Sequence, residues 1–328
     1  MFDDFTSSFW ANTIDGMTVG SIYALVALGY TMVYGVLRLI NFAHSEIFMI
    51  GTFGALATMQ ITGINGPFTG FALVAVLLLC LAGSMLASGG AAVALERIAY
   101  RPLRKRGASR LAALISAIGA SLFLQELFAT VIIPKWFAHG RGRDTLGLAQ
   151  AGGEPRRLMD KEVLFSIGSG DVRNDKVLII VAALAMMIIL QLFVTRSKLG
   201  RGIRATAQDP ETAVLLGVNI DRIVVVTFLI GGLMAGAAAF FFLLFYEVTS
   251  YFIGFILGIK AFTAAVLGGI GNLKGALVGG FTLGLVENYG ASIFGSEWKD
   301  VIAFTILVIV LMFRPTGILG ESLQRARA

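Results

Sequence analysis

The chain has 328 residues, of which 57% are hydrophobic and 14% are charged, and its formal net charge is +6. A soluble domain usually carries about 25% charged residues, so this composition excludes an ordinary water-soluble domain, and its high hydrophobicity excludes a disordered chain. The basic balance is typical of cytoplasmic loops in a membrane protein, and we expect no nucleic-acid partner.

Nine apolar runs follow one another along the chain, and a spanning helix needs about 20 predominantly apolar residues. In chain order the runs are 17–36, 41–61, 67–95, 111–134, 177–194, 223–246, 252–267, 275–287 and 301–313. The third run is long and the last three are short. The sequence therefore predicts an all-α polytopic membrane protein, a single transmembrane domain over residues 1–328, with about eight to ten transmembrane or re-entrant helices.

Basic residues gather in three stretches: 97–110, 196–204 and the C-terminal tail with Arg314. The positive-inside rule puts all three in the cytoplasm. Three runs precede the first stretch, so the N-terminus is predicted to lie outside and the C-terminus inside. Residues 135–176 then form an extracytoplasmic loop. This loop is also basic, but acidic residues interleave with its arginines, and we expect short strands or a small helix in it.

A cytoplasmic loop over residues 197–221 carries the signals of one short helix. Asp209 is a good N-cap, Pro210 suits the first helical position, and Glu211 adds negative charge to the first turn. Gly217 is placed to end the helix. The spacing predicts a helix of about two turns, which is too short to be stable alone in water.

This short helix must therefore pack against something. Ala213, Val214 and Leu216 give it a small apolar surface. One interpretation is a helix that docks into a groove on another subunit, with the small Ala213 letting the groove close around Leu216. The other is an ordinary connector that packs on its own chain.

Several polar residues lie within or beside the apolar runs, where ionisable groups usually face a cavity or a partner. The candidates for a hydrated translocation pathway are Asn41, His44, Glu46, Lys260 and Asn272. The cluster from Asn41 to Glu46 breaks an apolar stretch, as discontinuous transporter helices do. The alternative is structural: Glu46 pairs with His44 or with Lys260 and holds helices together.

A weak internal repeat accompanies this pattern. Residues 40–46 and 270–275 each form a polar break beside apolar segments rich in small residues. Two related halves around a central cytoplasmic loop are typical of transporters.

Enzyme motifs are absent from the sequence. It contains no G-x-x-x-x-G-K-[ST] phosphate loop, and the distant His44 and His139 with the single Cys80 cannot compose an ordinary zinc site. The sequence predicts neither an enzyme nor a cofactor in this chain.

Long motifs resemble a known family. SIYALVALGYTMVYGVLRLINFAHSEIFMIG (21–51), AFTAAVLGGIGNLKGALVGG (261–280) and RPTGILG (314–320) are similar to signatures of the Liv-type, H-like branched-chain amino acid permeases of ABC importers. YRPLR (100–104) and LISAIGASLFLQ (114–125) also match, and 197–221 resembles the coupling loop. The resemblance covers nearly the whole chain except 135–176. One departure is Ser45, where relatives usually carry glycine.

The resemblance implies a multi-pass permease subunit in the bacterial cytoplasmic membrane, importing leucine, isoleucine or valine. It implies a second permease subunit, either a paralogue or another copy, two cytoplasmic ATPase subunits that bind ATP-Mg, and an extracytoplasmic solute-binding protein. The expected ATPase-coupling residues are Asp209, Pro210, Glu211, Thr212, Ala213, Leu216 and Gly217. Alternatives are a related urea or short-chain amide importer and a stand-alone secondary transporter.

Overall fold

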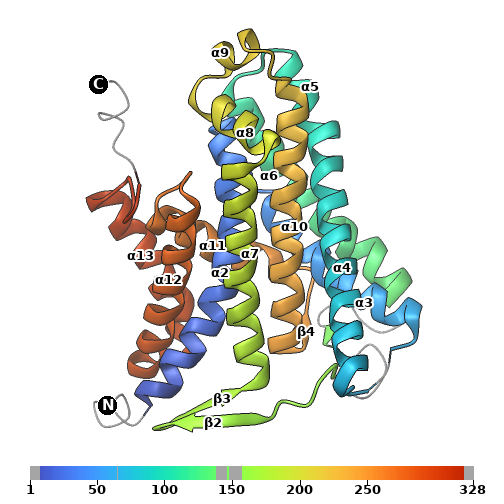
Figure 1. Cartoon of the computed structure of the whole chain (residues 1–328), viewed down its shortest axis with the longest axis vertical. Helices are drawn as coiled ribbons and strands as arrows, with labels where there is room; N and C mark the ends of the chain where they lie inside the picture. Colours follow the sequence, from blue (N-terminus) through green and yellow to red (C-terminus); the bar gives the residue numbers. More distant parts are fainter. Residues whose placement is uncertain (1–7, 65, 138–145, 148–156, 321–328) are drawn as a thin grey trace. The chain divides into compact units, whose positions relative to one another are not determined.

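The computed structural model describes residues 8–64, 66–137, 146–147 and 157–320, which are predominantly helical (Figure 1). This confirms the predicted all-α class. The elements in chain order are α2 (Phe9–Leu37), α3 (His44–Thr62), α4 (Gly70–Leu95), the π-helix η1 (Glu96–Tyr100), α5 (Arg101–Lys105), α6 (Arg110–Leu127), the π-helix η2 (Phe128–Phe137), β1 (Leu146–Gly147), β2 (Val163–Ile167), β3 (Gly170–Arg173), α7 (Asn174–Arg196), α8 (Lys198–Gln208), α9 (Pro210–Leu215), α10 (Ile220–Tyr246), β4 (Val248–Thr249), α11 (Ile253–Gly268), α12 (Leu273–Phe294), the 3-10 helix η3 (Ser296–Trp298) and α13 (Lys299–Phe313).

Five helical stretches of the described chain are long and apolar enough to cross a membrane: Phe9–Leu37, Gly70–Lys105, Leu111–Phe137, Asn174–Arg196 and Ile220–Tyr246. The pair α11–α12 bends by 119° at its break and is either one broken span or a re-entrant hairpin. Together with α3 and the 15-residue α13, these helices account for all nine apolar runs. At 1.5 Å per residue, α13 rises about 22 Å, less than the roughly 30 Å of a hydrocarbon core.

The chain divides into two compact units, each built from separate stretches of sequence. The first comprises Met1–Arg38, Lys161–Val218 and Ile259–Ala328. The second comprises Leu39–Asp160 and Asn219–Gly258. Neither unit is one continuous stretch, so no single linker separates them.

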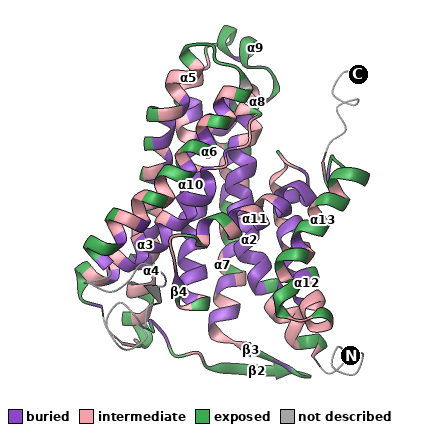
Figure 2. Cartoon of the chain, turned by 180° about the vertical axis from the view of Figure 1, so that it is seen from behind, coloured by how far each residue is buried: buried purple, intermediate pink, exposed green. Residues whose placement is uncertain are grey.

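In the first unit, α2 and α12 pack through glycines that face one another. A Cβ on Gly280 would lie 2.6 Å from atoms of Ala24, and one on Gly20 would lie 2.8 Å from the Gly280 carbonyl oxygen. Gly16 approaches Gly284 in the same way, so the two helices run antiparallel. This close contact buries most of α2, as Figure 2 shows. Small residues let membrane helices approach until their backbones touch.

In the second unit, α3, α4 and α10 pack through small residues and serine hydroxyls. The Ser84 hydroxyl on α4 lies 2.8 Å from the carbonyl oxygen of Gly51 on α3 and 2.6 Å from that of Gly236 on α10. The Ser88 hydroxyl donates to the Ile47 carbonyl at 2.8 Å. Both serine hydroxyls therefore have a partner within the protein, as the interior of a membrane requires.

Two long buried helices end in the same unusual way. Arg38 after α2 (φ 51°) and Glu247 after α10 (φ 57°) are the two non-glycine residues of the described chain with a positive φ. Each begins a six-residue linker, 38–43 and 247–252, that leads into the next helix. In the structure, the linker 38–43 therefore corresponds to the linker 247–252. Residues 40–46 were paired with residues 270–275 from sequence, but 270–275 lie at the bend between α11 and α12.

The predicted outer loop 135–176 is shorter in the structure. Residues 135–137 continue η2, and α7 begins at Asn174, because both helices extend beyond their apolar runs. The expected short strands are present as the antiparallel hairpin β2–β3. Residues 138–145 and 148–156 of this loop lie outside the described residues, as do Arg325 and Arg327 of the predicted basic tail.

Candidate functional site

The short helix α9 is capped at both ends, as predicted. The Asp209 carboxylate accepts from the backbone N–H of Glu211 at 3.0 Å and from the Thr212 hydroxyl. These hydrogen bonds lower the pKa of Asp209, so the cap stays charged near neutral pH. At the other end Gly217 has a φ of 81°, and the N–H of Val218 donates to the Ala213 carbonyl at 3.0 Å.

The exposed face of α9 differs from the predicted one. Ala213 is 1% exposed and packs inside the chain, so it is not part of the outward surface. That surface consists of Val214, Leu215 and Leu216, with Leu215 86% and Leu216 76% exposed. Leu215 was not singled out from sequence, because a six-residue helix is too short for a periodic pattern to show which side faces outward. An apolar patch held on a capped helix is suited to docking on another protein.

A second helix, α8, precedes α9 in the segment predicted as a loop. The Ser197 hydroxyl caps it by accepting from the N–H of Gly200 at 2.8 Å. A Cβ at Gly200 would lie 2.3 Å from the Val194 carbonyl oxygen, so only glycine fits this tight turn from α7 into α8. The turn therefore sets the position of α8 and of α9 behind it.

Arg38 holds the far end of α8. Its Nη2 donates to the carbonyls of Ala207 (2.8 Å) and Gln208 (3.3 Å), two of the orphan carbonyls at the helix C-terminus. Sequence reasoning missed this role, because Arg38 lies 169 residues before Ala207.

Replacing Arg38 by alanine is expected to loosen the junction between α8 and α9. Two charge-assisted hydrogen bonds in an exposed position contribute about 1 kcal/mol, so amide hydrogen exchange over residues 205–216 should accelerate about fivefold. Arg38→Lys should show a smaller change. Arg201→Ala, an exposed arginine on the same helix, is the control. Equal exchange in Arg38→Ala and Arg201→Ala would contradict the bracing role.

In the second unit, the predicted polar cluster surrounds the start of α3. The Tyr100 hydroxyl donates to Asn41 Oδ1 at 2.9 Å. The N–H of His44, whose side chain is buried, donates to the Asn41 carbonyl at 3.0 Å. Glu46 is fully buried, and its Oε1 lies 3.1 Å from the Ser121 hydroxyl. The structure thus brings Asn41, His44 and Glu46 together.

Glu46 keeps one oxygen without a partner. Its Oε2 is buried and has no hydrogen-bond partner within the protein. This oxygen faces the start of α11, where a Cβ on Gly254 would lie 2.9 Å from it and 2.6 Å from the Ser45 carbonyl oxygen. The backbones of α3 and α11 therefore approach closely at Ser45, and the glycine at position 254 makes this approach possible.

In the first unit, Lys260 is paired within the protein. Its Nζ lies 2.6 Å from Glu287 Oε1 and 2.7 Å from Asp300 Oδ1. The Tyr23 hydroxyl donates to Glu287 Oε2 at 2.8 Å. These contacts join α11, α12, α13 and α2, and they support the structural interpretation of Lys260, although with Glu287 rather than Glu46.

Asn272 has a clear local role. Its Oδ1 accepts from the N–H groups of Lys274 (3.0 Å) and Gly275 (3.3 Å), so it caps α12. Its Nδ2 donates to the Leu319 carbonyl at 2.8 Å and ties the segment after α13 to the bend.

The predicted cytoplasmic arginines form an ion network in the second unit. Arg104 lies 2.6 Å from Asp221 and 3.1 Å from the buried Glu96, and Arg101 lies 3.4 Å from Asp221. From sequence, these arginines indicated the orientation and contributed to the family resemblance, but their ion pairs were not predicted. The network ties the first turn of α10 to η1 and α5.

The chain is similar in sequence to known transport proteins. The family described as branched-chain amino acid transport system / permease component matches residues 12–311. The chain is 42% identical over 318 residues to the high-affinity branched-chain amino acid transport system permease protein BraD of Pseudomonas aeruginosa, covering 94% of each chain. It is 40% identical over 319 residues to LivH of Escherichia coli, a permease protein with the same description, covering 95% of this chain and 96% of that one.

Proposed function

Because the chain belongs to the family of branched-chain amino acid transport system permease components, we propose that it imports leucine, isoleucine and valine as the membrane-spanning subunit of an ATP-driven importer. The observation that carries the substrate class is the identity of 40–42% over nearly the full length to two permeases of that description. The chain is a transport subunit and not itself an enzyme.

The proposed partners follow from this assignment. Two cytoplasmic ATPase subunits bind ATP-Mg, and one of them docks on α9 of this chain, whose exposed Leu215 and Leu216 form the contact. A second permease subunit, either a paralogue or another copy, completes the membrane part. An extracytoplasmic solute-binding protein delivers the amino acid. Support for the ATPase contact comes from the capped, exposed and apolar geometry of α9.

The proposed location is the bacterial cytoplasmic membrane, with the N-terminus outside and the C-terminus in the cytoplasm. Within the first unit, Asp15 near the start of α2 pairs with Lys176 near the start of α7. Arg38 at the end of α2 contacts α8, which follows α7. The two helices therefore run in the same direction, and a cytoplasmic α8 puts the starts of α2 and α7 outside.

For the translocation pathway, we propose that Asn41, His44 and Glu46 contribute polar groups, because they meet at a helix break and Glu46 Oε2 has no partner within the protein. Lys260 and Asn272 would act on the same pathway indirectly, by holding α11 and α12 in their bent arrangement.

The test is ATP-driven uptake by proteoliposomes that contain this permease with its ATPase and permease partners. Labelled leucine should accumulate only when both ATP and the solute-binding protein are present, and labelled urea should not accumulate. Urea accumulation would favour the amide-importer alternative. Leucine accumulation without any ATPase subunit would show a stand-alone transporter.

A further inference from the structure

The hairpin β2–β3 is locked against the first turns of α2. Gly168 at its tip has a φ of 56°, and a Cβ there would lie 2.4 Å from the Trp10 ring. A Cβ on Gly170 would lie 2.7 Å from the Trp10 carbonyl carbon and 2.7 Å from Ile14 Cδ1. The tip of the hairpin is therefore packed tightly against α2 at Trp10 and Ile14.

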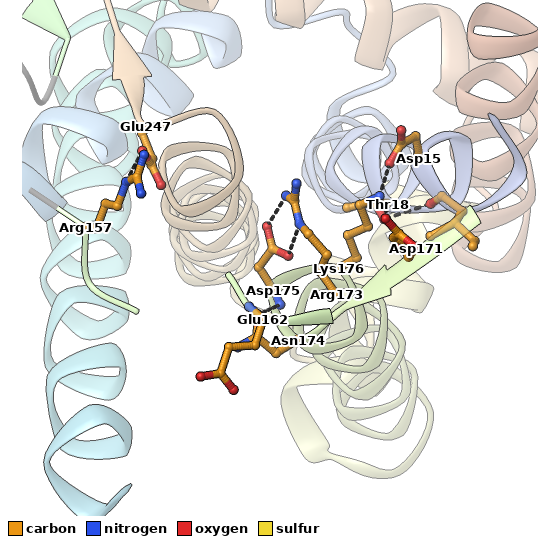
Figure 3. A network of polar contacts seen from close by, with 11 residues as sticks. Asp15, Thr18, Arg157, Glu162, Asp171, Arg173, Asn174, Asp175, Lys176 and Glu247 are labelled. Carbon is orange, nitrogen blue, oxygen red and sulfur yellow. Dashed lines mark hydrogen bonds and ion pairs between the residues drawn. The ribbon is translucent and has the colours of Figure 1, made fainter. Parts of the chain in front are cut away.

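Two ion pairs, each with one buried partner, brace the same hairpin, as Figure 3 shows. The Nζ of Lys176, a residue 7% exposed, lies 2.6 Å from Asp15 Oδ1 and donates to the Asp171 carbonyl at 3.2 Å. The Arg173 guanidinium makes two hydrogen bonds, of 3.0 and 2.7 Å, to the buried carboxylate of Asp175. Bidentate and buried pairs hold their geometry better than surface pairs do. β3 is thus fixed to α2 and to α7.

The outer strand of this rigid hairpin exposes apolar side chains. Val163, Leu164, Phe165 and Ile167 of β2 are 51%, 56%, 54% and 39% exposed. Among the described residues, β2 pairs with β3 alone, so its other edge carries free backbone N–H and C=O groups. An apolar strand with a free edge is a ready site for another chain to bind.

Two occupants fit this strand poorly. The hydrocarbon of the bilayer does not accommodate an unpaired strand edge, so lipid tails do not cover β2. Four apolar residues that are 39–56% exposed offer far less surface than the about 800 Å² that each partner buries in a stable subunit interface. The strand alone is therefore too small to hold a permanent permease partner. It suits a water-soluble protein that binds and leaves.

We propose that β2 is a docking strand for the solute-binding protein, with Phe165 as its main apolar contact. This inference rests on the proposed function. Because β3 is fixed to the first turns of α2 and α7, a protein bound on β2 would act directly on the outer ends of two membrane helices. The hairpin thereby links delivery of the substrate to the membrane domain.

The experiment compares Phe165→Ser with Phe294→Ser in the complete reconstituted complex. Phe294, at the end of α12, is 63% exposed and serves as the matched control. The measured quantity is ATP hydrolysis against the concentration of leucine-loaded solute-binding protein. Phe165→Ser should raise the half-maximal concentration about 30-fold, as loss of an interface hot spot does, and Phe294→Ser should leave it unchanged. Hydrolysis without the binding protein should be equal in both variants.

A second measurement keeps the inference testable if Phe165→Ser lowers the yield of the complex. A photo-cross-linking amino acid at position 164 of the otherwise unchanged complex should capture the solute-binding protein. Capture of lipid or of the second permease subunit instead, or an unshifted curve for Phe165→Ser, would overturn the docking role. A wild-type complex that the binding protein does not stimulate would count against the proposed function itself.

Discussion

Replacing Leu215 by aspartate is expected to leave the permease folded in the membrane but to release its ATPase subunits. Leu215 is 86% exposed, so a polar side chain there disturbs no packing within the chain. In the proposed complex, however, the aspartate would bury a charge in the apolar contact made by α9. Truncation of a central interface residue costs about 2 kcal/mol or more, and burying an unpaired charge adds to this.

The measurement is co-purification of the ATPase subunits with the tagged permease, together with leucine uptake. We expect retention to fall at least roughly 30-fold, the equivalent of about 2 kcal/mol, and uptake to be lost. Leu215→Met keeps the apolar surface and should retain the ATPases. Full retention by Leu215→Asp would show that α9 is only a connector. Ala213→Trp is a poorer probe, because Ala213 is buried within the permease.

Replacing Lys260 by methionine is expected to prevent the permease from accumulating in the membrane. The change removes the ammonium group that pairs with Glu287, which is 2% exposed, while Asp300 can still be hydrated. Breaking a buried ion pair by removing one partner typically destabilises a protein by about 3–5 kcal/mol. The amount of folded permease extracted in mild detergent, followed during heating, measures this effect.

The double variant Lys260→Met/Glu287→Gln separates structure from transport. A glutamine can keep the hydrogen bond from Tyr23 and carries no charge, so accumulation should return. If Lys260 acts by holding α11 and α12, uptake should return as well. A double variant that accumulates fully but does not transport leucine would instead place Lys260 in the pathway.

Local features of this fold were predictable from sequence because they depend on neighbouring residues. The length of the apolar runs indicated the membrane helices. The N-cap of α9 at Asp209 and its end at Gly217 were predictable because capping residues stand at fixed positions relative to a helix. The short strands of the outer loop were also expected. Long motifs identified the family, which is shown by the match over residues 12–311.

The sequence could not predict which polar side chains pair with one another, because these pairs join segments that are distant in the chain. Lys260 and Glu287 are 27 residues apart, and Ser121 reaches Glu46 over 75 residues. α8 was missed because its glycines and arginines give no apolar run, and its position depends on the tight turn at Gly200. Membrane sequences are apolar on most faces, so periodicity says little about which face meets which neighbour.

The division into two compact units has a mechanical consequence. The backbone passes from one unit to the other at four peptide bonds, which follow Arg38, Asp160, Val218 and Gly258. Two of these four crossings adjoin the α8–α9 segment: Val218 closes the C-terminal turn of α9, and Arg38 binds the last carbonyls of α8. A displacement of the six-residue helix α9 would therefore act at the same time on two of the four peptide connections between the units, those at Arg38 and Val218.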